Sequence, residues 1–344
     1  MQWALAVDFI LISVSLVAAS ALRSRIGFLQ RFLVPNAVTA GFIGLALFHL
    51  TGMVYPELQP SREVLGGIVY HLLAVTFISI ALKKRTRYVE RDAVATAFHL
   101  TLGYAVEGLI GYSLTLAFLF TVFPDLFPTF GMLFEIGFGQ SSGQAYALGR
   151  QWEELGFLHG GAVGLTFGAV GFLWAFFTGI PVLNWGVRRG LVSAVRPETL
   201  RNPGFYRPRE RKPEAGRRTT HPDAVSSGAF HLAVIGSVYL LVYLVVGGAV
   251  RLLELSGSPY TSRLGSLLWA YHAFLGTLFA MLVGRVVDRL GLRHLLDEET
   301  LTGISAGSVD FLVTAAIMAI EIVVVVRYAV PLAVICLVGG SSTL

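Results

Sequence analysis

Residues 137–149 read GFGQSSGQAYALG and interrupt a strongly apolar stretch of the chain with glycine, serine and glutamine. Lipid cannot hydrogen-bond to peptide groups, so irregular backbone is tolerated at membrane depth only where protein covers it or where it lines an aqueous cavity. Short, mostly apolar arms flank the polar centre, at about 129–139 and 143–153. The pattern predicts a helix that breaks inside a membrane and turns its loosened backbone toward a solute.

The composition indicates an integral membrane protein. Of the 344 residues, 55% are hydrophobic and 14% are charged, whereas soluble domains carry about 25% charged residues. The mean hydropathy is +0.69. The net charge of +5 does not indicate nucleic-acid binding, because the basic residues lie in short clusters between apolar runs, as membrane topology requires. The single cysteine, Cys336, excludes a disulfide within the chain.

Apolar runs long enough to cross a bilayer recur along the chain, since a spanning helix needs about 20 residues. The first run starts at Trp3 with no basic residue before it and no small-residue cleavage site after it. We therefore expect it to be a retained span and not a signal peptide. The predicted spans are 3–22, 32–53, 65–82, 94–123, 157–182, 228–250, 264–284 and 304–325.

Basic residues predict the orientation of these spans. The loops after the first, third, fifth and seventh spans hold 21 of the 26 Lys and Arg residues. The positive-inside rule places all four loops in the cytoplasm, and the N-terminus outside the cell's inner (plasma) membrane. The residues are Arg23, Arg25 and Arg31; Lys83, Lys84, Arg85, Arg87 and Arg91; Arg188, Arg189, Arg196, Arg201, Arg207, Arg209, Arg211, Lys212, Arg217 and Arg218; and Arg285, Arg289 and Arg293.

This topology requires a re-entrant hairpin over about 129–153. Span 94–123 ends outside and span 157–182 must begin outside, so the segment between them returns to its starting side. A full crossing would place the most basic loop outside. Each arm is roughly 16 Å long as a helix, which reaches about the middle of the bilayer. An ordinary extracellular loop is the alternative, and the apolar content of 130–138 argues against it.

The loop 185–227 divides the chain into two membrane regions. It is rich in proline and charge and poor in apolar residues, which is a linker composition. We predict a first repeat, 1–184, with five spans and the hairpin, and a partial second repeat, 228–344, with about three spans. The two regions begin on opposite sides of the membrane, as an inverted repeat requires. The expected fold is all-α, with the two regions arranged as an inverted repeat.

The hairpin tip offers groups that suit an anionic solute. The second arm begins near Gly143, so its first N–H groups lack intrahelical partners and carry the positive end of the helix dipole. A carboxylate binds favourably there. The tip side chains can hydrogen-bond the same solute, or the serines can act only as helix caps. The candidate substrate-binding residues are Gln140, Ser141, Ser142, Gly143, Gln144 and, in the third span, Ser79.

Oxygen ligands for a cation are expected in two places. The first arm ends with unpaired carbonyls, which suit a sodium ion, and span 304–325 contains an acid surrounded by three hydroxyl side chains. The candidate sodium ligands are Gly137, Phe138, Gly139 and Asp310. Glu107, in the middle of span 94–123, stays open as the carboxyl group of a proton-coupled mechanism.

Small residues follow the hairpin. Gly160, Gly164 and Gly168 recur at a spacing of four, which places them on one helical face where another backbone can approach closely. The hairpin is the expected partner, and a second copy of the chain is the alternative. No zinc-spaced His and Glu pair and no phosphate-binding Gly-Lys motif occurs, and no histidine lies close in sequence to Ser141 and Ser142 to act as a base, so we expect no enzymatic activity and no cofactor besides a coupling ion.

Three segments resemble bacterial sodium/glutamate symporters. Residues 34–41, VPNAVTAG, are similar to the start of that family's second helix. Residues 137–149, with Trp152 and Glu153 after them, resemble its glycine-rich re-entrant motif. Residues 301–322, followed by Pro331, are similar to a helix of its second half.

The resemblance implies an all-α, ten-helix, inverted-repeat secondary transporter with a re-entrant loop in each half, so that the second repeat is incomplete in this chain. It also implies sodium-coupled uptake of glutamate or a related small organic anion by a homodimer. This chain carries GQSSGQ where the family has a Gly-Gly-x-Gly type of tip, and it has no second glycine-rich hairpin before Leu344. The alternative is therefore a truncated or degenerate, non-transporting membrane module or a partner subunit.

Overall fold

A computed structural model of the protein describes residues 4–54, 60–84, 91–191, 204–205, 216, 218–221, 223–255 and 259–343. In this part of the chain every regular element is a helix and none is a strand. Six helices there are long and apolar enough to cross a membrane. The prediction of an all-α, multi-pass membrane protein is confirmed at this level.

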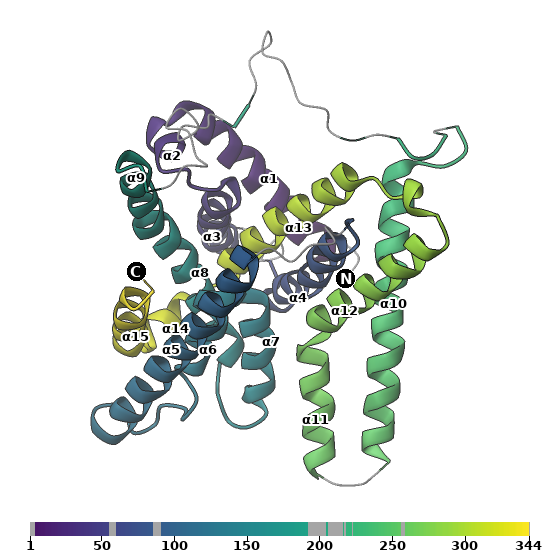
Figure 1. Ribbon diagram of the computed structural model, residues 1–344. Coiled ribbons are helices and arrows are strands. Elements are labelled where there is room, and N and C mark those ends of the chain that lie inside the picture. The colour runs from purple at the N-terminus through teal and green to yellow at the C-terminus, as the bar shows by residue number, and fades with distance from the viewer. Residues whose placement is uncertain are drawn as a thin grey trace. The chain divides into compact units, whose positions relative to one another are not determined.

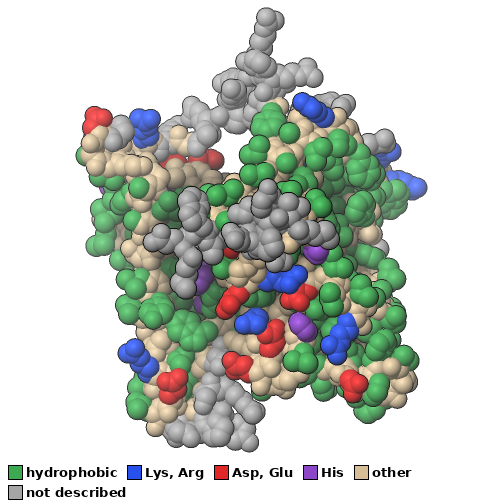
Figure 2. Space-filling view, turned by 180° about the vertical axis from the view of Figure 1, so that it is seen from behind, with side chains coloured by type: hydrophobic (Ala, Val, Ile, Leu, Met, Phe, Trp, Pro, Cys, Tyr) green, Lys and Arg blue, Asp and Glu red, His purple; other side chains and the backbone are tan. Residues whose placement is uncertain are grey.

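The surface agrees with contact to lipid. Hydrophobic side chains cover much of the face drawn in Figure 2. Among the exposed ones, Phe98 and Phe120 of α5 (Arg91–Thr121) are 71% and 79% exposed. Large apolar patches of this kind are unfavourable in water and mark a surface that another apolar medium covers.

The contacts divide the chain into two compact units, and each is discontinuous in sequence. Two helices, α4 (Arg62–Ala81) and α13 (Glu298–Met318), contribute residues to both units. This division differs from the predicted repeats 1–184 and 228–344, because residues 313–344 belong to the same unit as residues 1–69. Unit 1 comprises 1–69, 91–210 and 313–344, and unit 2 comprises 70–90 and 211–312.

Unit 1 contains the segment 129–153, which the sequence predicts to be a hairpin. Its first helices pack as a pair: the Asn36 amide at the start of α3 donates to the Leu16 carbonyl oxygen at 3.1 Å and to Ser20 Oγ of α1 at 2.8 Å. Besides the beginning of α4 and the end of α13, its elements (Figure 1) are α1 (Ala4–Arg25), α2 (Gly27–Arg31), α3 (Asn36–Val54), α5, α6 (Met132–Phe134), the π-helix η2 (Glu135–Gln140), α7 (Ser142–Glu153), α8 (Gly160–Trp174), the π-helix η3 (Ala175–Gly179), α9 (Ile180–Arg188), α14 (Ile322–Arg327) and α15 (Ala329–Ser341).

Unit 2 is held by polar contacts between its helices. The Tyr70 hydroxyl donates to the Trp269 carbonyl oxygen at 2.6 Å, and His272 Nε2 lies 3.0 Å from the Tyr70 carbonyl oxygen. His71 Nδ1 lies 2.7 Å from the Tyr239 hydroxyl. Besides parts of α4 and α13, the elements are α10 (Ser227–Glu254), α11 (Pro259–Ala270), α12 (His272–Arg289) and the 3₁₀ turn η5 (Arg293–Leu295).

Two predicted spans differ from the structure. The span 264–284 is divided between α11 and α12 at Tyr271. The span 304–325 is not continuous, because α13 ends at Met318 and α14 begins at Ile322. Most of the predicted linker 185–227 lies outside the described residues, although its first residues still belong to α9.

Candidate functional site

The helix of the hairpin breaks at Ser141, inside the predicted tip. This residue is extended, with φ −159° and ψ 127°, between η2 and α7. Its N–H donates to the Ile136 carbonyl oxygen at 2.7 Å and closes the last π turn. Glycine disfavours continued helix, and paired serines favour extended backbone or a helix start. The local sequence therefore accounts for the position of the break.

The two ends of the hairpin segment lie together. The Phe127 ring stacks on the Phe157 ring with centroids 4.6 Å apart, and it lies 6.3 Å from the Trp152 ring. Phe127 precedes α6, whereas Trp152 and Phe157 stand at the end of α7 and after it. The chain thus folds back on itself at the break (Figure 1).

The folded-back segment packs against the glycine face of α8. A Cβ atom at Gly164 would lie 2.5 Å from the Ala145 carbonyl oxygen, and one at Gly171 would lie 2.6 Å from the Phe138 carbonyl oxygen. Gly160 and Gly168 make similarly close approaches to Gly149 and Ser142. The helices α7 and η2 therefore rest directly on the backbone of α8. The prediction that the hairpin is the partner of this face is confirmed.

A second contact holds the start of the hairpin on α5. The buried Thr115 hydroxyl accepts a hydrogen bond from the Gly131 N–H at 2.9 Å and donates one to the Gly111 carbonyl oxygen at 2.8 Å. The backbones of the two glycines touch, so that a Cβ atom on either would collide with the other. The first arm is therefore fixed between α5 and α8.

The predicted substrate-binding residues of the tip lie around the break. Ser142 is 2% exposed, and its hydroxyl has no hydrogen-bond partner. Gly143 is buried, and Gln144 is half-buried in the first turn of α7. No side chain caps the N-terminus of α7, since Ser141 makes no cap hydrogen bond. Gln140 is exposed, and its amide donates to the Glu135 carboxylate.

Other candidates are placed differently. The carbonyl oxygens of Gly137 and Phe138 face Gly168 and Gly171 of α8 and are covered by that contact, whereas Gly139 faces α5. The remaining two candidates, Ser79 and Asp310, belong to unit 2. The Ser79 hydroxyl donates to the Val75 carbonyl oxygen within α4 at 2.6 Å. The structure thus brings together the candidates of the hairpin.

Glu135 is a polar residue that the sequence analysis did not single out. It lies in η2, and its side chain passes over Gly108 of α5. In return, the Glu107 carboxylate of α5 lies against Gly139 of η2. A signal existed in the sequence, because Glu135 is the only acidic residue between Leu126 and Trp152.

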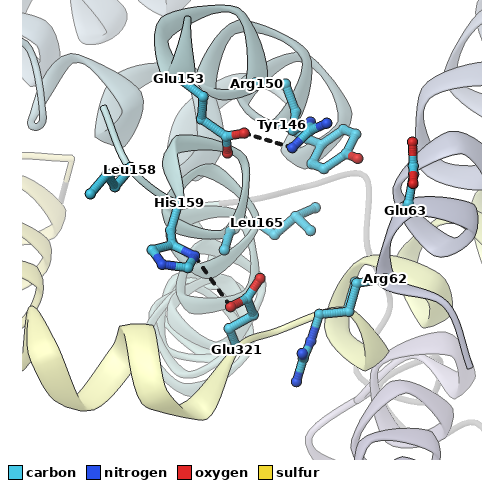
Figure 3. A pocket seen from close by; sticks show the side chains of 11 residues that line it. Arg62, Glu63, Tyr146, Arg150, Glu153, Leu158, His159, Leu165 and Glu321 are labelled. Carbon is cyan, nitrogen blue, oxygen red and sulfur yellow. Dashed lines mark hydrogen bonds and ion pairs between the residues drawn. The ribbon is translucent and has the colours of Figure 1, made fainter. Parts of the chain in front are cut away.

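A polar cavity of about 440 Å³ opens beside α7. Arg150 and Glu153 form an ion pair of 2.6 Å there, and Glu153 also accepts from the Gly161 N–H at 3.0 Å. The two side chains point toward each other at one end of the cavity in Figure 3. The lining residues are Arg62, Glu63, Tyr146, Arg150, Glu153, Leu158, His159, Ala162, Leu165, Ala319 and Glu321.

A second helix break borders the same cavity. Between α13 and α14, Ala319 and Ile320 are 2% and 8% exposed, and Glu321 has φ −91° and ψ 102°. The Glu321 carboxylate lies 3.5 Å from His159 Nδ1, an ion pair when the imidazole is protonated. His159 has the left-handed φ of 63° at the start of α8. This break lies within the predicted continuous span, and its sequence contains neither glycine nor proline.

No protein-family model, curated protein or solved structure matches the chain. The likeness to sodium/glutamate symporters therefore rests on the sequence motifs alone.

Proposed function

We propose that the protein is a sodium-coupled secondary transporter for glutamate or a related small organic anion. In this proposal the solute binds at the break around Ser141, and access alternates between the two sides of the membrane. The observation that carries the proposal is the fold-back of residues 127–157. The two ends of this segment lie together, and the chain turns at the N-terminus of α7, which has no side-chain cap.

The proposal treats the fold-back as a re-entrant hairpin of the membrane domain. Six long apolar helices supply that domain. A break at membrane depth needs either protein cover or an aqueous cavity. The face toward α8 has protein cover, whereas Gln140 is exposed. We propose that this open side meets the aqueous pathway of the solute.

The chemistry of the break favours an anionic group. The first N–H groups of α7 point out of the helix with the positive end of its dipole. The buried Ser142 hydroxyl lies beside them without a partner. A ligand that forms a hydrogen bond with this hydroxyl removes the cost of leaving it unpaired and so stabilises the bound state. A carboxylate of the solute meets both requirements.

Orientation and assembly are further parts of the proposal. Basic loops support a location in the inner (plasma) membrane with the N-terminus outside. Coupling to sodium, transport of glutamate and a homodimeric state rest on the family resemblance.

Solute flux in proteoliposomes tests the function. Purified protein is reconstituted, and uptake of labelled glutamate, other amino acids and dicarboxylates is measured with an inward gradient of sodium or of choline. We expect uptake of a small organic anion that depends on sodium. Absence of flux for every anion, in protein that is folded and inserted, would support the non-transporting module instead.

Ser142→Ala tests the site. Loss of one hydrogen bond of about 0.5–1.5 kcal/mol weakens apparent solute affinity by about 2- to 10-fold. The thermal stability of the empty protein is unchanged or increased, because a buried unpartnered hydroxyl is removed. Ser13→Ala is the matched control, since this serine is half-buried on α1 and donates only to the Phe9 carbonyl oxygen of its own helix. Unchanged affinity in Ser142→Ala would remove this residue from the site.

A further inference from the structure

The Tyr146 ring of α7 lies between two glycines of neighbouring helices. A Cβ atom at Gly66 of α4 would collide with Tyr146 Cζ and Oη. A Cβ atom at Gly161 of α8 would lie 3.1 Å from Tyr146 Cε2. All three residues belong to unit 1. One ring therefore fills the space between α4 and α8 at this point, and it fits there because neither glycine carries a side chain.

The same ring stands between the polar cavity and the helix break. Tyr146 and Leu165 line the cavity on α7 and α8 (Figure 3). Ser142 lies four positions before Tyr146, which is one turn or about 6 Å along the axis of α7. The Ser142 side chain packs on Gly168, three positions after Leu165 on α8. The cavity and the break therefore occupy successive turns of one helix contact, and Ser142 is 2% exposed behind the ring.

The cavity has the size and the walls of a passage for a polar solute. Its volume of about 440 Å³ lies in the range of cavities that hold small ligands. Charged side chains of both signs line it, among them Arg62 and Glu63 of α4 and the ion pair of Arg150 with Glu153. Such groups keep a cavity hydrated, because removing them from water is unfavourable. The proposed orientation places this end of α7 on the outer side of the membrane.

We propose that the cavity is the outer vestibule of the solute site and that the Tyr146 ring is the gate between the two. With the ring packed on Gly66, as in this structure, a solute in the vestibule does not reach the first N–H groups of α7. Movement of the ring away from Gly66 opens the path along α7 and α8 to Ser142. The gate is steric, since the aromatic ring itself fills the space between the two glycines.

This inference deepens the proposed function, on which the role of the gate in transport rests. Alternating access requires that the site close toward one side of the membrane while it opens toward the other. The exposed Gln140 marks the open approach to the break, and Tyr146 marks the closed one. The gate itself is a property of the packing, so it can be tested in protein that transports nothing.

Cysteine labelling at the break tests the gate in the purified chain. Ser142→Cys is combined with Cys336→Ala, which removes the native thiol, and the rate of reaction with a small water-soluble maleimide is followed by mass spectrometry. Gly66→Ala should raise this rate about tenfold or more, because the cost of overpacking falls on the closed state alone. Gly67→Ala is the matched control, since it adds the same methyl group to α4 with nothing within 4 Å.

Substitution of the ring gives a second test. Tyr146→Ala should raise the labelling rate at least as much as Gly66→Ala does, whereas Tyr146→Phe, which keeps the ring, should leave the rate unchanged. Each variant is first checked for a monodisperse elution profile and wild-type helix content, so that unfolding is not read as opening.

Two outcomes would overturn the gate. In the first, Gly66→Ala and Tyr146→Ala react no faster than Gly67→Ala, so that the ring does not control access. In the second, Ser142→Cys with the native ring reacts as fast as a cysteine at the exposed position of Glu154, so that the break is open. The gate and the function fail separately. Faster labelling of Gly66→Ala in protein without solute flux would support the gate and contradict transport, and flux with equal labelling of the two glycine variants would do the reverse.

Discussion

Unit 1 contains two helix breaks that both contact α8 and are held in different ways. The break at Ser141 lies on a face of glycines, where backbone meets backbone and a single Cβ atom would collide. At the break at 319–321 the Glu321 carboxylate lies 3.5 Å from His159 Nδ1 at the start of α8, an ion pair when the imidazole is protonated, and the two side chains are 25% and 47% exposed. Shape fixes the first break, and charge contributes to the second.

The comparison indicates which contacts resist change. Close-packed backbone has no side chain that can rotate away, so an added atom must displace a helix. A partly exposed ion pair is weakened by solvent and side-chain entropy. We therefore expect the fold to depend strongly on the glycine contact and weakly on the ion pair.

Gly164→Val should have the largest effect. Its Cβ atom would lie within 2.5 Å of the Ala145 carbonyl oxygen and 3.0 Å of the Tyr146 nitrogen, both backbone atoms. Overpacking of this kind costs about 1–3 kcal/mol or more, and we expect the upper end because neither atom can turn aside. Thermal unfolding followed by fluorescence-detected size exclusion measures the loss.

Gly67→Val is the matched control for this substitution. Gly67 lies inside α4, and a Cβ atom there meets nothing within 4 Å. It carries the same helix-propensity change from glycine to valine without the collision. Equal melting temperatures of the two variants would show that the glycine face does not hold the hairpin.

Thr115→Val should have an intermediate effect. The substitution keeps the side-chain shape but leaves the buried Gly131 N–H without its acceptor. An unsatisfied buried donor costs about 1–3 kcal/mol. The melting temperature of Thr115→Ser should stay near that of the wild type, since a hydroxyl is retained. Thr121→Val is the control, because this exposed threonine bonds only to the Ala117 carbonyl oxygen of its own helix. A loss in the control as large as in Thr115→Val would contradict the role of the Gly131 contact.

The sequence was sufficient to predict the first break but not the second. Glycines and paired serines weaken a helix locally, and they mark the break at Ser141. The residues Ala319, Ile320 and Glu321 have no such local signature. Their break accompanies tertiary contacts, and these are not encoded in local propensity.

The sequence likewise predicts only part of the candidate site. Its tip residues are contiguous in sequence, so one motif identifies them together. Glu135 gains its significance from Glu107, which is 28 positions earlier and meets it only through the packing of η2 on α5. The predictions for Ser79 and Asp310 rest on residue type within apolar spans, and residue type does not determine which unit a helix joins.

Glu321→Gln should reduce thermal stability less than Gly164→Val or Thr115→Val does. Partly exposed ion pairs contribute about 0–1 kcal/mol, and the 3.5 Å separation from His159 Nδ1 is longer than that of a strong charge-assisted hydrogen bond. A double-mutant cycle with His159→Asn isolates the pair. We expect a coupling free energy below about 1 kcal/mol at low salt that falls further at 1 M salt, where the Debye length is about 3 Å. The comparison would be reversed if the coupling free energy exceeded the loss of stability in Thr115→Val and did not fall at high salt. Charge at the second break would then stabilise unit 1 more than the packing of the hairpin does.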